Sequence, residues 1–391
     1  MEETQKGKIA RKILVVAMYV CSVLIAFFVS FTMPFAWYFR VLIMLSGLVL
    51  NWLAISLFHE LGHVVAAKLN GFDTVKFDFL IFGYDKTAVK RFSVKFGRGT
   101  LGETDVAPTG VENIGKRYAR VVFGGIAGSI FACAVLTVGF VIGVLCKSPV
   151  TATLFCGMPL SYVVLIINSV SGFAKNSDGE ILSLLLADEE AEENPENAEE
   201  SGGENENNDA KKEIIARKEA IIKLLTVTAL LKDGKTYGEI SPELYETDEG
   251  ISESQQTAFA LIKLRRAEEL ADDECIAYNL DMLERSDCLD DECRAEMLCA
   301  YIILDVDEKV KEYENALEYC DDLSGAASMR TLIYHAEYRG DKQYVKTSLN
   351  TAKKICTTAY LKGDGKFNEI MLSRIVVEDS ETVSRARFEP H

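Results

Sequence analysis

The first half of the chain consists of long apolar segments separated by short charged ones. A helix that crosses the hydrocarbon core of a bilayer needs about 20 mostly apolar residues. Four segments meet that length: Ile13–Met33, Phe35–Leu69, Val121–Cys146 and Val150–Ala174. A cleaved signal peptide is the alternative for the first, but its length and the lack of a small-residue cleavage site favour a membrane anchor. We predict a mainly α-helical protein whose polytopic membrane core has about four transmembrane helices.

Basic residues around these segments predict how the chain crosses the membrane. They precede the first segment and gather in the connection over residues 70–117, whereas the other two connections contain only Arg40 and Lys147. Loops rich in lysine and arginine stay on the cytosolic side. We therefore predict a multi-pass protein of the plasma membrane, in contact with the lipid bilayer, with both termini in the cytosol.

The connection after the second segment has the pattern of β-strands. Val75–Ile81 and Arg91–Phe96 alternate apolar and polar residues, and Gly83–Asp85 would form the turn between them. We predict a small amphipathic β-hairpin whose edge can pair with an extended peptide by strand addition. A hairpin that lies at the membrane surface without binding a peptide is an equally good interpretation.

The second half of the chain is polar and has helical periodicity. Residues 188–210 contain many acids and no basic residue, which predicts a disordered linker extended by self-repulsion. Helical spacing then recurs in Lys211–Asp233, Ser254–Leu270, Glu274–Glu284, Asp291–Leu304, Glu308–Leu323, Ala326–Arg339 and Gln343–Leu361. We predict a membrane domain over 1–187, the acidic linker over 188–210 and a soluble cytosolic domain over 211–391. Stacked helical hairpins similar to a TPR array would bind a protein partner, and a plain bundle without a partner is the alternative.

Charge and cysteine content restrict the partners further. The chain has 59 acidic and 42 basic residues and a net charge of −17, and the excess acid lies in the second half. Nucleic acid is therefore not an expected partner, because binding it needs clustered lysine and arginine. The 10 cysteines lack metal-like pairs in the second half, which favours reduced thiols in a cytosolic domain.

The second apolar segment contains the motif His59-Glu60-Leu61-Gly62-His63. On a helix, histidines four apart project from one face and can bind one metal ion. Neutral imidazole is a good zinc ligand, and Glu60 can accept a proton from a water whose pKa zinc lowers to about 7. Each ionisable group at membrane depth costs about 2.5–3.5 kcal/mol, so three within five residues need a local partner. Ordinary core packing explains them poorly, and we predict a catalytic zinc.

A third ligand is expected, because catalytic zinc usually has three protein ligands. Asp178 and Glu180 follow the fourth apolar segment on its cytosolic side, whereas His335 and His391 lie in the soluble half. A carboxylate there would need a broken or re-entrant backbone to reach the depth of His59. From its position alone, Asp178 is better explained as the N-cap of a helix over Gly179–Ala187.

The order of these motifs resembles the site-2 protease family of intramembrane zinc metalloproteases. The resemblance covers about residues 36–187: HELGH in a membrane helix, then Asn168 and Ser177-Asp178-Gly179 two apolar segments later. It implies that Asp178 is the third zinc ligand and that Asn168 steadies the substrate, although Ser171 stands where many members have proline. The small-residue stretch Gly124–Ser129 resembles one in the family's middle core helix, but close helix packing is the preferred interpretation.

These motifs predict a zinc metalloendopeptidase that hydrolyses peptide bonds of membrane-embedded or membrane-associated proteins, with Glu60 as the base. The alternative is a catalytically silent membrane scaffold that recruits partners through its C-terminal helical domain. A scaffold has no need for a general base between two metal-binding histidines, so Glu60 favours the enzyme.

Overall fold

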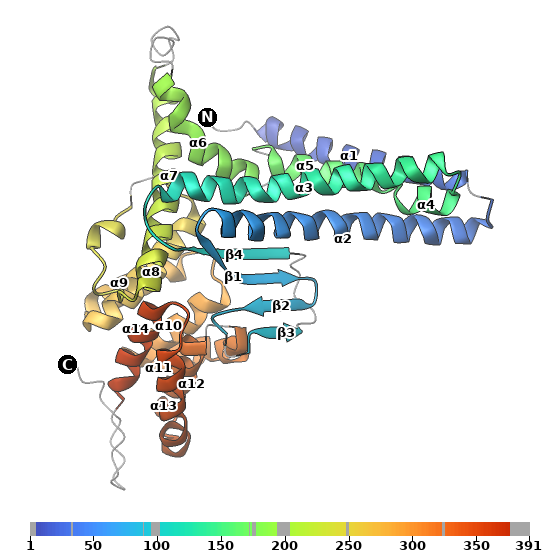
Figure 1. The fold of residues 1–391 in the computed structure, drawn as a ribbon. Coiled ribbons are helices and arrows are strands. Elements are labelled where there is room, and N and C mark those ends of the chain that lie inside the picture. Colours follow the sequence, from blue (N-terminus) through green and yellow to red (C-terminus); the bar gives the residue numbers. More distant parts are fainter. Residues whose placement is uncertain are drawn as a thin grey trace. The chain divides into compact units, whose positions relative to one another are not determined.

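The chain is mainly helical, with one small sheet (Figure 1). The computed structural model describes residues 5–32, 34–88, 90–94, 102–171, 173, 177–193, 204–247, 250–322 and 325–375. The chain divides into two compact units. The first comprises Met1–Gly83, Val94–Val106 and Gly115–Ile214, and the second comprises Tyr84–Ser93, Ala107–Ile114 and Ile215–His391.

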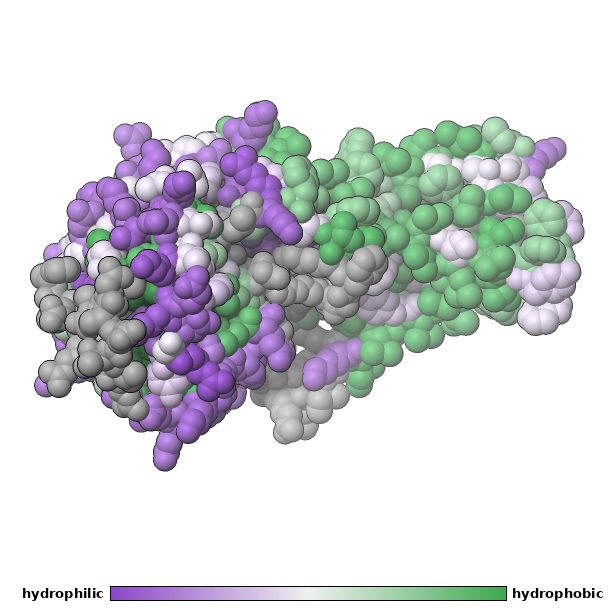
Figure 2. Space-filling view, turned by 90° about the horizontal axis from the view of Figure 1, so that it is seen from below, coloured by the Kyte–Doolittle hydropathy of each residue, from purple (hydrophilic) through white to green (hydrophobic). Residues whose placement is uncertain are grey.

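Among the residues described, three helices of the first unit are long and apolar enough to cross a membrane. They are α1 (Gln5–Phe31), α2 (Trp37–Leu69) and α3 (Ile114–Leu145). At 1.5 Å per residue, the 33 residues of α2 and the 32 of α3 exceed the roughly 30 Å of a hydrocarbon core. Many large apolar side chains of these helices are exposed, and the face seen in Figure 2 is mostly apolar there (green). Such a surface suits lipid, as expected of a membrane protein.

The fourth apolar segment differs from the prediction of one continuous helix. It forms two short helices, α4 (Pro149–Leu154) and α5 (Met158–Ser169). Asn51 of α2 is buried, and its Nδ2 donates a hydrogen bond of 2.7 Å to the carbonyl of Leu154, where α4 ends. A side-chain amide inside the bundle thus satisfies a carbonyl that the helix break leaves free, which is the condition for irregular backbone at membrane depth.

Helices α2 and α3 approach each other through glycines. A Cβ atom on Gly62 would lie 2.1 Å from the carbonyl oxygen of Gly124, and one on Gly128 would lie 2.1 Å from that of Phe58. Backbones this close leave no room for a side chain, which is how small residues work between membrane helices. The small-residue stretch therefore serves helix packing, and it holds α3 against the histidine face of α2.

The two predicted strands belong to a four-stranded sheet but do not pair as a hairpin, because another strand lies between them. The strands of the sheet are β1 (Phe72–Phe79), β2 (Phe82–Asp85), β3 (Phe92–Val94) and β4 (Gly102–Pro108), in the order β3-β2-β1-β4. The predicted turn over Gly83–Asp85 is wrong, because these residues lie in β2. The chain turns before these residues, between β1 and β2, where Leu80 has a φ of 57°. Strand β4 was not predicted, since its sequence GETDVAP has few apolar residues.

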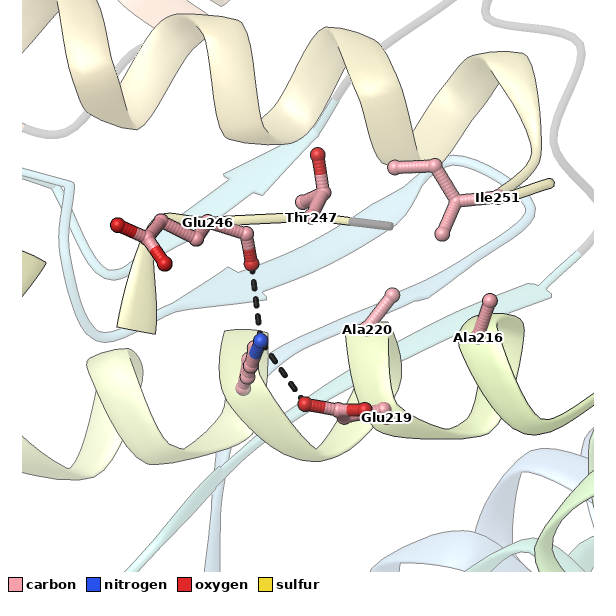
Figure 3. Close-up of a pocket in the computed structure, with 7 residues that line it drawn as sticks. Ala216, Glu219, Ala220, Glu246, Thr247 and Ile251 are labelled. Carbon is pink, nitrogen blue, oxygen red and sulfur yellow. Dashed lines mark hydrogen bonds and ion pairs between the residues drawn. The ribbon is translucent and has the colours of Figure 1, made fainter. Parts of the chain in front are cut away.

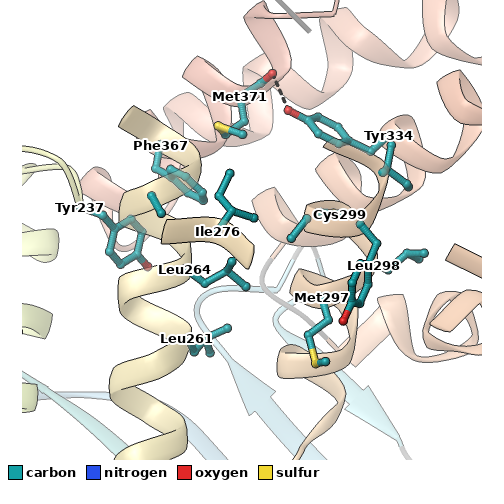
Figure 4. Close-up of a cluster of buried hydrophobic side chains, with 14 of the residues drawn as sticks. Tyr237, Leu261, Leu264, Ile276, Met297, Leu298, Cys299, Tyr334, Phe367 and Met371 are labelled. Atoms are coloured by element: carbon teal, nitrogen blue, oxygen red, sulfur yellow. Dashed lines mark hydrogen bonds between the residues drawn. The ribbon is translucent and has the colours of Figure 1, made fainter. Parts of the chain in front are cut away.

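The second unit is helical, and its helices follow the predicted periodicity closely. They are α7 (Glu204–Asp233), the 3-10 helix η2 (Pro242–Leu244), α8 (Glu253–Leu270), α9 (Asp273–Glu284), α10 (Asp291–Ile303), α11 (Asp307–Tyr313), the 3-10 helix η3 (Glu314–Asp322), α12 (Gly325–Tyr338), α13 (Lys342–Thr357) and α14 (Lys362–Ser373). The segment predicted over Glu308–Leu323 splits into α11 and η3, and α14 was missed. Consecutive helices pack in pairs around one apolar core (Figure 4). A TPR-like arrangement remains a prediction.

The ends of the predicted acidic linker are helical. Helix α6 (Asp178–Glu193) and α7 both extend into residues 188–210. The stretch between them, residues 194–203, lies outside the described part of the chain.

A network of buried charges joins three helices of the second unit. Arg330 of α12 lies at the centre: its Nη1 is 3.0 Å from Glu268 Oε2, and its Nη2 bonds Glu296. Arg265 of α8 bonds the other oxygen of Glu296 at 2.8 Å. All four side chains are buried. Buried charges of this kind are tolerated only when each has a partner.

Burial raises the pKa of Glu268 from its ordinary value of 4.5 to about 7, although Arg330 acts in the opposite direction. For Glu296 the two arginines prevail over burial, and its pKa falls below the ordinary value. Burial likewise raises the pKa of Asp364, which is hydrogen-bonded to Tyr237. In the folded state Glu268 thus holds its proton to a higher pH than in the unfolded state, so rising pH withdraws stability.

We predict that the second unit loses stability as pH rises from about 4.5 to about 7. Hydrogen exchange of α8, α10 and α12 in the full-length protein, corrected for the intrinsic exchange rate, should show protection that falls over this range. Glu268→Gln, which keeps the shape and removes the titration, should flatten the dependence. Protection that rises between these pH values in the wild type would contradict the assignment.

Candidate metal centre

The two histidines of the motif lie together on α2. One helical turn separates His59 from His63, and their Nε2 atoms are 3.3 Å apart. Their rings meet nearly at right angles. The side chains therefore converge on one point beside the helix, as their spacing predicts.

Asp178, more than 100 residues later in the sequence, completes this group. It is the first residue of α6, and its Oδ2 lies 3.3 Å from His59 Nε2 and 3.1 Å from His63 Nε2. Ligand atoms of the three residues all lie within 4.8 Å of one another. The carboxylate thus reaches the histidines from the first turn of α6, directly after Ser177.

The N-cap alternative for Asp178 fits the structure less well. The carbonyl of Ser177 accepts the hydrogen bond of Ile181 N–H, and its hydroxyl lies 3.4 Å from the amide nitrogen of Glu180. Ser177 therefore occupies the capping position, one residue before Asp178. The Asp178 carboxylate is left to face the histidines.

Two further features show that these residues suit a metal ion. Asp178 Oδ2 is buried and has no hydrogen-bond partner among the described residues, a costly state for a carboxylate oxygen. A Cβ atom on Gly125 of α3 would lie 2.3 Å from His63 Nε2 and 2.6 Å from Asp178 Oδ2, so the glycine leaves the convergence point open. Two imidazoles and one carboxylate are a donor set typical of catalytic zinc.

Helix α3 orients both imidazole rings. Ser129 Oγ lies 2.9 Å from His59 Nδ1, and the carbonyl oxygen of Val121 lies 3.0 Å from His63 Nδ1. The carbonyl can only accept, so His63 carries its proton on Nδ1 and presents the Nε2 lone pair to the convergence point. Such outer partners fix the tautomer and orientation of metal-binding histidines. Sequence reasoning missed Ser129, whose one signal was its place in the small-residue stretch.

Glu60 is buried beside the histidines, with an exposed fraction of 9%. The hydroxyl of Thr104, on β4, donates a hydrogen bond of 2.6 Å to Glu60 Oε2. This contact bridges 44 residues of sequence and joins the candidate base to the sheet. No local pattern predicts it.

The other candidate residues lie outside the ligand group. Asn168 is half-buried in the last turn of α5, next to Ser169, whose carbonyl oxygen would lie 2.3 Å from a Cβ on Gly179. The end of α5 and the start of α6 are thus in close contact, but the role of Asn168 stays a prediction. His335 pairs with Glu314 at 2.8 Å in the second unit, and His391 lies outside the described residues.

A small pocket in the second unit is a weaker candidate site (Figure 3). Its wall comes from α7 and from the segment before α8. Lys223 crosses it, donating to the Glu246 carbonyl oxygen and to Glu219, each at 2.9 Å. These polar groups satisfy one another.

No protein-family model matches the chain, and no curated protein or solved structure matches it either. The ligand geometry is therefore the main guide to function.

We predict that Ser129→Ala weakens zinc binding about 10- to 100-fold, the usual cost of removing an outer partner of a metal ligand. Titration of purified apoprotein with zinc measures the affinity. Ser56→Ala is the matched control, because the Ser56 hydroxyl donates to a carbonyl of its own helix, that of Trp52, and lies outside the ligand group. Equal zinc affinity of the Ser129 variant and wild type would contradict an orienting role.

We also predict that Gly125→Ala abolishes zinc binding, because the added methyl group would occupy the convergence point. Elemental analysis of the purified variant should find far less than the one zinc ion per chain expected of wild type. Gly110→Ala serves as the control, since a Cβ there meets nothing within 4 Å. Full zinc content in the Gly125 variant would place the metal elsewhere.

Proposed function

We propose that the protein is an intramembrane zinc metalloendopeptidase that hydrolyses peptide bonds of membrane-embedded or membrane-associated proteins. The observation that supports this most is the group of His59, His63 and Asp178, with ligand atoms within 4.8 Å of one another on an apolar helix bundle. The resemblance of the motif order to site-2 proteases agrees with it. The zinc ligands would be His59 Nε2, His63 Nε2 and Asp178 Oδ2.

The chemistry needs a metal ion and a base. Zinc, when bound, polarises the scissile carbonyl and makes water more acidic. Glu60 accepts the proton of the attacking water and then delivers it to the leaving amine. The hydroxyl of Thr104 donates a hydrogen bond to Glu60 Oε2 and leaves the carboxylate with free lone pairs for the proton transfer.

The surroundings of the site point to the class of substrate. His59 lies on α2, one of the helices apolar enough to cross a membrane, about ten residues from its end at Leu69. An apolar bundle around the site favours a membrane-embedded or membrane-associated substrate over a soluble one. We propose four spans with both termini in the cytosol of a plasma-membrane protein, the α4–α5 pair completing the fourth. The second unit would bind a protein partner.

Strand β4 offers a way to present an extended substrate. It is an edge strand of the sheet, with β1 as its one neighbour among the described strands. A helical substrate hides its amides in its own hydrogen bonds, and pairing with an edge strand would hold it unwound. The edge that carries Thr104, next to Glu60, is the best placed to do so.

The decisive experiment compares wild type with Glu60→Gln on a panel of single-span membrane proteins in liposomes, with zinc content measured in both. We expect both proteins to hold zinc and the variant to cleave about 10²- to 10⁴-fold more slowly, the usual contribution of a general base. Cleavage at equal rates would contradict the assignment of Glu60.

A second pair of variants tests the metal ligands. Asp178→Ala should lose zinc, whereas Glu180→Gln, two residues along α6 and outside the ligand group, should retain it. Zinc-loaded wild type that cleaves no member of the panel would favour the scaffold function instead.

A further inference from the structure

One face of strand β4 is fitted to the side chain of Glu60. Gly102 and Thr104 are two residues apart, so they share a face of the strand. A Cβ atom on Gly102 would lie 2.6 Å from Glu60 Cγ and 3.0 Å from Oε1, and the Thr104 hydroxyl reaches Oε2 at 2.6 Å. Gly102, which has no side chain, leaves room for the Glu60 methylene groups, and the Thr104 hydroxyl donates a hydrogen bond to the carboxylate.

This fit removes the freedom that a glutamate side chain usually has. Free rotation of its three dihedral angles would move the carboxylate over several ångströms, whereas a general base must lie within about 2.6–3.2 Å of the proton it takes. Thr104 is the hydrogen-bond partner of the Glu60 carboxylate among the described residues. A hydroxyl bonded to a carboxylate makes a short, charge-assisted hydrogen bond.

We propose that Thr104 is a positioning residue: its hydroxyl holds the Glu60 carboxylate in one orientation beside the metal centre. This role rests on the proposed protease function. It also gives β4 two tasks, because the edge strand that would pair with the substrate also holds the base. Binding an extended chain along β4 and orienting Glu60 would then depend on one element.

The test uses two substitutions of Thr104 in the full-length protein. Thr104→Val keeps the shape and removes the hydroxyl, and Thr104→Ser keeps the hydroxyl. With a fluorogenic peptide built on a single transmembrane segment, in detergent, Thr104→Val should lower kcat about 10- to 100-fold with KM and zinc content unchanged. Thr104→Ser should restore kcat to near the wild-type value.

Thr74→Val is the matched control, because Thr74 lies on the neighbouring strand β1 and is likewise half-buried. Its kcat should equal that of wild type. A raised KM with unchanged kcat, a loss of zinc, or an equal defect in Thr104→Ser would each overturn the positioning role.

A second readout does not depend on cleavage. In thermal unfolding, Thr104→Val should lower Tm in the wild-type background and have a smaller effect in Glu60→Ala, because the two groups share one hydrogen bond. Equal losses of Tm in both backgrounds would overturn the proposal. If wild type cleaves the peptide and Thr104→Val cleaves it equally fast, the positioning role alone is overturned. If wild type is as inactive as Glu60→Gln, both the protease function and the positioning role are contradicted.

Discussion

The constraint on which the first unit depends is the burial of a carboxylate among imidazoles inside an apolar bundle. Asp178 Oδ2 lies 3.3 Å from His59 Nε2 and 3.1 Å from His63 Nε2, and it forms no hydrogen bond with the described residues. In low dielectric, an unpaired carboxylate is far more costly than in water. A divalent cation at the convergence point would offset that cost, because it supplies the positive charge that the carboxylate lacks.

Much of the surrounding architecture follows from keeping that point open and rigid. The glycines of α2 and α3 let the two helices approach until Gly125 faces the ligand group without a side chain. The same close approach brings Ser129 to His59 and the Val121 carbonyl to His63. The same contacts between α2 and α3 thus pack the helices and orient the histidines, and a larger residue in the small-residue stretch would disturb both.

Features set by neighbouring residues could be predicted from the sequence, whereas features set by contacts between distant residues could not. The histidine pair, the apolar helices and most helices of the second unit are local patterns with a fixed period, so residues four apart sufficed to place His59 and His63. The break between α4 and α5 was missed although Gly157 and Pro159 mark it locally, at the N-cap and in the first turn of α5. Strand β4 and Thr104 were missed because a polar strand is recognisable only by the partner it packs against. The resemblance to a family pointed to Asp178, and position alone favoured a cap.

The second unit shows how the same chain buries charge where protein groups suffice. Glu268 and Glu296 lie as deep as Asp178 or deeper, yet each bonds a buried arginine that other helices supply. Asp178 has no such arginine among the residues described. The second unit thus supplies arginine partners for its buried carboxylates, whereas Asp178 in the first unit faces two imidazoles, which can be neutral. That difference agrees with the proposed metal site, because a guanidinium bonded to Asp178 would compete with a metal ion for the same oxygen.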